Sequence, residues 1–176
     1  MPSVVVLLIT ILVFAGVDAA TLPGLDKSPA DISAYPAKGQ DKIVKVIYSR
    51  PQAKGRSVFG KLVAYDKVWR TGANEATEVT FFTDVTIGGQ KIAKGTYSLF
   101  TIPTEKSWTV ILNKELNQWG AFDYKKESDV IRTIVQTTKV NDTVDAFTIT
   151  FDDKGKNQVE MILAWENTSI NIPIQY

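Results

Sequence analysis

The sequence predicts an all-β protein, specifically a two-sheet antiparallel β-sandwich of jelly-roll type, and three observations indicate it. Apolar and polar residues alternate along most of the chain, as they do on strands that bury one face. Turn-forming glycines separate several of these alternating runs. Only residues 113–129, which are rich in Lys and Glu, have a helical composition, and they are expected to form a short helix or a long loop.

The chain opens with an apolar run over residues 4–17 that only Thr10 interrupts. Val17-Asp18-Ala19 follows with the small-residue spacing that signal peptidases prefer. A helix of this length spans about 21 Å, which is shorter than the hydrocarbon core of a bilayer at about 30 Å. We therefore expect residues 1–19 to be a signal peptide. The mature protein is then secreted or periplasmic and makes no membrane contact after cleavage.

Residues 20–41 form the next segment, which shows no sustained hydrophobic period. Proline and glycine recur through it, and both residue types favour turns and irregular backbone. We expect an extended, loop-like lead-in, followed by a β-sandwich domain over residues 42–176. The residues that break the segment are Pro23, Gly24, Pro29, Pro36 and Gly39.

Nine alternating runs follow the lead-in, and this number of strands suggests two packed sheets. Gly88-Gly89 supplies the positive φ angles of a tight hairpin, and Asp153-Lys154-Gly155 can form a second turn. The expected strands cover residues 43–49, 78–82, 84–87, 97–102, 108–112, 130–136, 144–151, 158–165 and 169–174.

The expected interior is clearest in the late strands, where apolar side chains occur at every second position. Two tryptophans obey this alternation, so core packing is the favoured interpretation for both. The residues expected in the core are Trp108, Phe147, Ile149, Phe151, Val159, Met161, Leu163 and Trp165.

Composition excludes several kinds of chemistry. The chain has no cysteine and no histidine, so it has no disulfide, no thiolate zinc site and no serine–histidine or cysteine–histidine nucleophile. Its 20 Lys and Arg nearly balance its 19 Asp and Glu, so no global field recruits nucleic acid. We expect no cofactor and favour a non-enzymatic protein. Asp152 and Asp153 could bind calcium weakly, but a plain turn is the favoured interpretation, and we assign no metal.

Two loop segments, residues 48–56 and 68–77, carry the candidate binding residues. The first places three cations within seven residues, and the second groups an aromatic ring, a guanidinium, an amide and a carboxylate beside a glycine. An apolar ring with a few fixed hydrogen-bonding groups is suited to a small polar ligand or a glycan. A further tryptophan lies outside the strands and could stack on a sugar. The candidates are Arg50, Lys54, Arg56, Trp69, Arg70, Asn74, Glu75 and Trp119.

Other interpretations stay open for these residues. Arg70 and Glu75 could form a structural ion pair. Self-association through strand edges, as in a surface layer or filament, is a second function, motivated by the lead-in and by the apolar residues Ile170, Ile172 and Ile174. A carboxylate-dependent polysaccharide hydrolase or lyase is a third, with Glu75 and Glu166 as the pair to test.

Several strings of the sequence occur together and in order in one known family: Tyr48-Ser49-Arg50-Pro51, Lys54-Gly55-Arg56, Val68-Trp69-Arg70-Thr71-Gly72-Ala73-Asn74-Glu75-Ala76-Thr77, Gly95-Thr96-Tyr97-Ser98-Leu99-Phe100-Thr101-Ile102-Pro103, Trp119-Gly120-Ala121 and Leu163-Ala164-Trp165-Glu166. The chain resembles family number 2911 of the domain-of-unknown-function series, exported proteins of the Bacteroidetes type. It departs from the family pattern at Ala64 and Asp66, where Pro and Gly are expected. The resemblance implies export, a compact β domain and a bacterial source, and it supplies no activity or catalytic residue.

Overall fold

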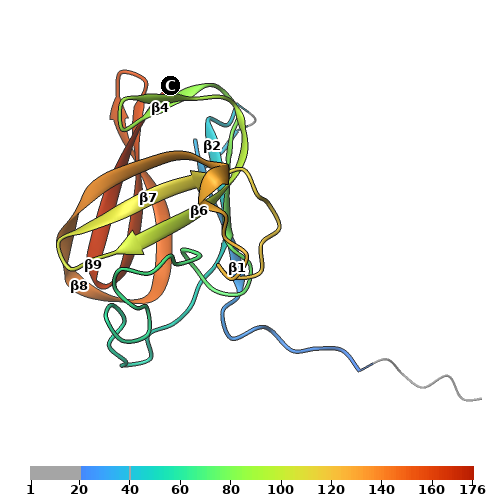
Figure 1. Ribbon diagram of the computed structural model, residues 1–176, viewed down its shortest axis with the longest axis vertical. Helices are drawn as coiled ribbons and strands as arrows, with labels where there is room; N and C mark the ends of the chain where they lie inside the picture. The colour runs from blue at the N-terminus through green and yellow to red at the C-terminus, as the bar shows by residue number, and fades with distance from the viewer. Residues whose placement is uncertain (1–20, 40) are drawn as a thin grey trace, which may run out of the picture.

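The computed structural model describes residues 21–39 and 41–176, and these residues are mostly strands, as Figure 1 shows. The all-β prediction is therefore confirmed. The expected signal peptide, residues 1–19, lies outside the described residues. Within the described ranges no helix is long and apolar enough to span a membrane. The strands are β1 Ala30–Tyr35, β2 Val44–Ser49, β3 Thr77–Phe81, β4 Val85–Ile87, β5 Gln90–Ile92, β6 Gly95–Pro103, β7 Ser107–Asn113, β8 Asp129–Gly155 and β9 Gln158–Gln175, with one 3-10 helix, η1 Lys126–Ser128.

The nine strands form one antiparallel sheet in the order β1-β2-β3-β6-β7-β8-β9-β4-β5. The two packed sheets that the sequence suggested are joined into this one sheet, because β8 and β9 each merge two of the predicted strands. The start of β8 pairs with β7, and β8 pairs with β9 from Thr137 onward, with register shifts between Lys139 and Thr148. We call β1, β2, β3, β6, β7 and the start of β8 the first layer. The rest of β8, together with β9, β4 and β5, is the second layer. In Figure 1, β6 and β7 of the first layer cross over β9 of the second.

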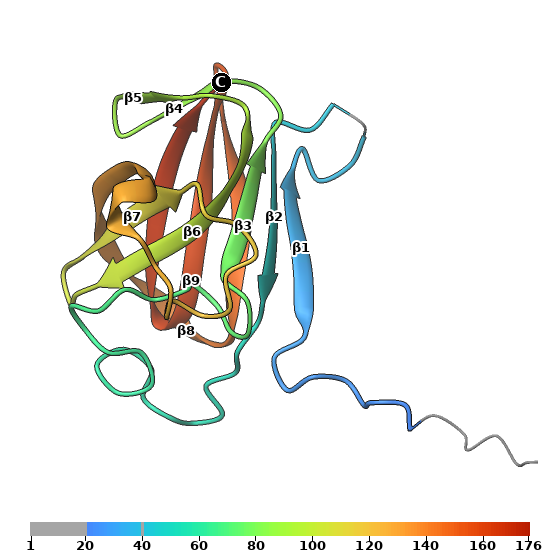
Figure 2. The ribbon, with the colours of Figure 1, turned by 45° about the vertical axis from the view of Figure 1, so that its right-hand side comes forward.

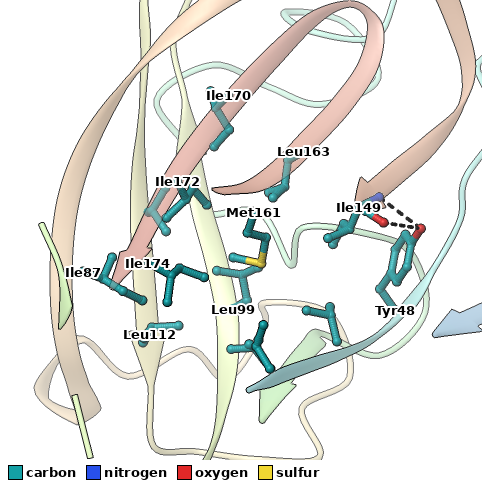
Figure 3. Packing of buried hydrophobic residues seen from close by; sticks show 14 of the residues in the cluster. Tyr48, Ile87, Leu99, Leu112, Ile149, Met161, Leu163, Ile170, Ile172 and Ile174 are labelled. Atoms are coloured by element: carbon teal, nitrogen blue, oxygen red, sulfur yellow. Dashed lines mark hydrogen bonds between the residues drawn. The ribbon is translucent and has the colours of Figure 1, made fainter. Parts of the chain in front are cut away.

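The core lies between the two layers and contains residues of both. Figure 3 shows Met161 of β9 beside Leu99 of β6. The alternation predicted for the late strands is confirmed, because every second residue from Val159 to Trp165 is buried. Of the expected core residues, only Phe151 is partly exposed.

The isoleucines near the C-terminus also belong to this core. Ile170, Ile172 and Ile174 are fully buried, and Figure 3 shows Ile174 beside Leu112. They therefore offer no apolar surface to a neighbouring molecule, and this motive for self-association disappears.

The structure places a strand, β1, inside the segment that we expected to be loop-like. β1 pairs with β2 along its whole length, from Ala30 opposite Ser49 to Tyr35 opposite Val44. It is an edge strand, and none of its side chains is fully buried. Because neither of its faces is buried, the apolar alternation that reveals a strand is missing. Figure 2 shows β1 at the outer edge of the sheet.

Residues 114–125 form the long loop that was one of the two expectations for residues 113–129, with η1 at its end. The buried Asn113 side chain organises this loop. It donates to the Lys125 carbonyl and to Asp129, both over 2.8 Å, and accepts from the Glu115 backbone N–H over 2.9 Å. These bonds satisfy backbone groups that a helix would otherwise have paired.

Both predicted turn regions contain turns, but the second has different residues at its tip. Gly88 and Gly89 connect β4 and β5 with positive φ angles, as predicted. Between β8 and β9 the connecting pair is Lys156 and Asn157, both with positive φ angles, and Gly155 just before them also has one. Asp152 is bound to Lys154 over 2.6 Å.

Tyr124 provides a test of stability against pH. Burial, together with the hydrogen bond that Tyr124 donates to Asp129, raises the pKa of Tyr124 from 10.0 to about 12. The folded protein therefore holds this proton more tightly than the unfolded chain does. Its contribution to stability is complete below about pH 10 and is lost as the pH rises towards about 12.

We expect the free energy of unfolding, measured by urea denaturation, to fall less between about pH 9 and about pH 11 in Tyr124→Phe than in the native protein. Phenylalanine keeps the ring but has no proton to lose. An equal fall in both proteins would show that Tyr124 does not titrate in this way.

Candidate functional site

A cavity of about 430 Å³ opens between the chain that follows β2 and the segment that leads into β3. Both segments belong to the β2–β3 connection, drawn in teal and green in Figure 2 at the end of the sheet where the chain enters β1. Four of the eight predicted binding residues line the cavity, namely Lys54, Arg56, Trp69 and Arg70. The lining also includes Lys27, Ser28, Pro51, Gln52, Leu62, Val63, Gly72, Ala73 and Trp165.

The backbone around Arg70 is fixed by hydrogen bonds on both sides. Trp69 exchanges two backbone bonds with Thr101 of β6, over 2.7 and 3.0 Å. Thr77 donates its backbone N–H to the Arg70 carbonyl over 3.1 Å and its hydroxyl to the Thr71 carbonyl over 2.6 Å. Arg70 is therefore held at one place relative to the sheet.

The next two residues, Thr71 and Gly72, are tightly constrained. Thr71 is fully buried and has a φ of +55°, a left-handed conformation that costs a non-glycine residue about 1–3 kcal/mol. A Cβ atom on Gly72 would lie 3.0 Å from the carbonyl oxygen of Ser49 and 3.1 Å from the hydroxyl of Thr77. Because only glycine fits this approach, the segment can pack directly onto the end of β2. This contact brings the two predicted loop segments together.

Trp69 forms a wall of the cavity and is partly buried. Its ring packs against Trp165, with centroids 6.0 Å apart and planes 19° apart, and against Phe147 at 5.1 Å. Phe59 and Trp108 also contact it, and its indole N–H donates to the Gly72 carbonyl. A sugar could therefore meet only the exposed part of this ring.

Arg70 has no hydrogen-bond partner within the described residues for its Nε atom, which is buried. The expected ion pair with Glu75 is not formed, because Glu75 is exposed and no ion pair of the described chain includes Arg70. Burial lowers the pKa of Arg70, as desolvation disfavours the charged form. The guanidinium nevertheless stays charged, since the normal pKa of arginine is far above neutral.

Lys54 and Arg56, the other two predicted cations of the cavity, lie on a loop of defined conformation, as Gly55 between them suggests. The Arg56 guanidinium donates to the carbonyls of Ala53 and Gln52 over 2.8 and 2.7 Å, which fixes the loop. The Lys54 backbone N–H donates to Asp145 over 2.8 Å, while its side chain is exposed. Together with Lys27 and Arg70, they give the lining four cations and no carboxylate.

The remaining predicted binding residues lie outside the cavity. Arg50 binds Asp31 of β1 over 3.1 Å and Thr148 of β8 over 2.7 Å, which is a structural role. Asn74 donates to Asp26 over 3.0 Å. Trp119 is 63% exposed on the loop after β7.

The carboxylate pair proposed for hydrolysis is not found in one cavity. Glu75 is exposed and pairs through its backbone with Trp119. Glu166 accepts a hydrogen bond from the Val58 backbone over 3.1 Å. Neither residue lines the cavity beside Arg70.

Sequence reasoning missed several residues of the cavity. Trp165 was assigned only to the core, although one side of it faces the cavity. Lys27 comes from the lead-in, where no pattern indicated a function. Gly72 was the one signal that the sequence offered. A glycine between Arg70 and Asn74 suggests that the backbone closely approaches another segment there.

The fold and the cavity define an all-β protein with a cationic, aromatic-walled site at one end of its sheet. A family model described as a protein of unknown function (DUF2911) matches residues 28–174, and the chain belongs to this family. No curated protein and no solved structure matches the chain.

One departure from the family pattern has a visible structural result. Asp66 stands where the resemblance leads us to expect glycine, and its φ is +57°. The left-handed turn is therefore kept, with a residue type that tolerates this conformation better than most.

Proposed function

We propose that this protein is an exported, non-enzymatic binding module for a polar ligand, most directly a glycan, which it holds in the cavity beside Trp69 and Arg70. One observation carries the proposal: the cavity lining combines the partly exposed ring of Trp69 with four cationic residues and no carboxylate. The apolar run at residues 4–17 supports export.

The dimensions and chemistry of the cavity suit such a ligand. Its volume of about 430 Å³ falls within the range of small-molecule sites, about 300–1,000 Å³. Trp69 offers the exposed part of its ring as apolar surface to a sugar, and Arg70 offers donors in a planar fork. Sugar sites need this combination, because a pyranose ring has an apolar face and a rim of hydroxyl groups.

Binding is favoured over catalysis by the same lining. Hydrolysis of a glycosidic bond ordinarily uses two carboxyl groups that flank it. The residues around this cavity supply lysines, arginines and amide or hydroxyl groups, but no carboxylate. They can hold and orient a ligand.

A glycan array followed by calorimetry tests the proposal on the purified protein. We expect Arg70→Met to weaken binding of any glycan found by about tenfold or more, because a charge-assisted hydrogen bond contributes about 1.5–3 kcal/mol. Trp69 is a poor choice for mutation, since four aromatic rings pack on it.

Lys61→Ala is the matched control, because it also removes one positive charge from the same connection. Lys61 is exposed and does not line the cavity, so its replacement should leave binding unchanged. The proposal fails if the native protein binds no glycan, or if Arg70→Met binds as tightly as the native protein.

A further inference from the structure

We infer that the group held beside Arg70 is an anion, so that the ligand is an acidic glycan carrying a carboxylate, sulfate or phosphate rather than a neutral one. This inference rests on the proposed function and specifies its ligand. Four observations lead to it: the charge of the lining, the lack of a partner for Arg70, the acids that could have supplied one, and the fixed backbone.

The first observation is the local charge. Lys27, Lys54, Arg56 and Arg70 line the cavity, and no carboxylate does. The whole chain has a net charge of only +1, so this excess is a local arrangement rather than a result of composition. Cations gathered around a concave surface of low dielectric attract anions from solution.

The second observation concerns the four arginines of the chain. Arg50 is paired with Asp31 at 3.1 Å, and Arg132 with Asp129 at 2.8 Å. Arg56 donates to two carbonyls of its own loop. Of the four, only Arg70 makes no side-chain hydrogen bond within the described residues, although its Nε is buried. A buried donor left unpaired costs about 1–3 kcal/mol. Because the Nε atom is closed to solvent, a bound anion would meet the terminal nitrogens of the guanidinium.

The third observation is that acids near Arg70 are directed elsewhere. Glu75 lies five residues along the chain, yet it is exposed and its backbone pairs with Trp119. Asp26, beside the cavity residue Lys27, instead accepts from the backbone of Ser28 and the side chain of Asn74. Among residues 21–39 and 41–176, the guanidinium is therefore left without a counter-ion.

The fourth observation is that Arg70 is held in place. Its neighbours are fixed to β6, Thr71 adopts a left-handed backbone, and Gly72 packs against the end of β2. Local strain of this kind persists only where the surrounding structure imposes it, and it is common at binding sites. From this fixed backbone the planar arginine fork suits a carboxylate, sulfate or phosphate, each of which offers two oxygens side by side.

The cavity also explains why the anion should belong to a sugar. Trp69 provides exposed apolar surface in the same lining as Arg70, so a ring with a charged substituent would use both residues. Lys54 is exposed at the same opening and would draw in a chain of repeated charges.

A matched pair of ligands tests the inference by calorimetry. Oligogalacturonate carries free carboxylates, and its methyl ester has the same sugars without the charge. We expect the acid form to bind about tenfold more tightly or better, with the difference lost in Arg70→Met and reduced in Arg70→Lys, which keeps the charge but not the fork. A sulfated oligosaccharide and inorganic phosphate, used as separate probes, identify which anion is preferred.

The outcomes separate the inference from the proposed function. Equal binding of acid and ester would overturn the inference and leave glycan binding standing. An acid preference that persists in Arg70→Met, or that also disappears in Lys61→Ala, would overturn the role of Arg70. Absence of binding to every glycan would end both.

Thermal unfolding of Arg70→Met adds a readout that is independent of any ligand. If Arg70 were a structural arginine, its loss would lower the melting temperature, as expected for a broken ion pair. Because no partner is left behind, we expect the melting temperature to stay the same or to rise. A clear fall would contradict the claim that Arg70 is unpaired.

Discussion

Replacing Trp165 by alanine is expected to lower the free energy of unfolding by about 3–5 kcal/mol, as for other large aromatic residues in cores. Its side chain is 1% exposed. The ring stacks on Trp69 and packs against Phe147 at 5.8 Å. Its indole N–H donates to the Asp145 carbonyl over 2.8 Å. Alanine would remove these contacts, leave a void beside Trp69 and so loosen a wall of the cavity.

Urea denaturation measures this loss, and Trp119→Ala is the matched control. The substitution is the same, but Trp119 is 63% exposed, so its replacement should change the free energy of unfolding by no more than about 0.5 kcal/mol. Similar losses in the two variants would contradict the assignment of Trp165 to the core.

Replacing Gly88 by alanine should lower the free energy of unfolding by about 2–4 kcal/mol. The φ of Gly88 is +57°, and this conformation costs a residue with a side chain about 1–2 kcal/mol. A Cβ atom there would lie 2.5 Å from the hydroxyl of Thr133 and 2.9 Å from its Cβ. Relieving this overlap between the β4–β5 hairpin and β8 adds about 1–3 kcal/mol.

Gly89→Ala separates the two costs of the substitution. Gly89 also has a positive φ, +78°, but its added Cβ would meet nothing within 4 Å. We expect this variant to lose only the conformational part, about 1–2 kcal/mol. Equal losses at Gly88 and Gly89 in urea denaturation would show that contact with Thr133 does not matter.

Much of the fold could be predicted because most strands bury one face. Alternation located the parts of β8 and β9 and assigned Trp108 and Trp165 to the core. It could not show that two neighbouring runs form one strand, because a register shift on β8 leaves no mark in the sequence. β1 was missed for a different reason, since an edge strand with half-exposed side chains has no apolar period.

The candidate site was predicted in part. Clusters of cations and aromatic residues indicated the correct connection, and four of its residues line one cavity. Arg50 was predicted by the same reasoning but lies outside the cavity, bonded to Thr148, a partner too distant in sequence for a local pattern to indicate. The key property of Arg70 is the lack of a partner. No local pattern can reveal it, because it depends on where every nearby acid points.

The continuity of β8 has a consequence for how the protein unfolds. β8 pairs with β7 in the first layer and with β9 in the second, and the core residues of both layers form one cluster. Neither layer can separate without breaking the ladder that the other shares. The molecule should therefore unfold as a single cooperative unit, in which backbone amide protons of β2 and of β9 become accessible to exchange in the same event.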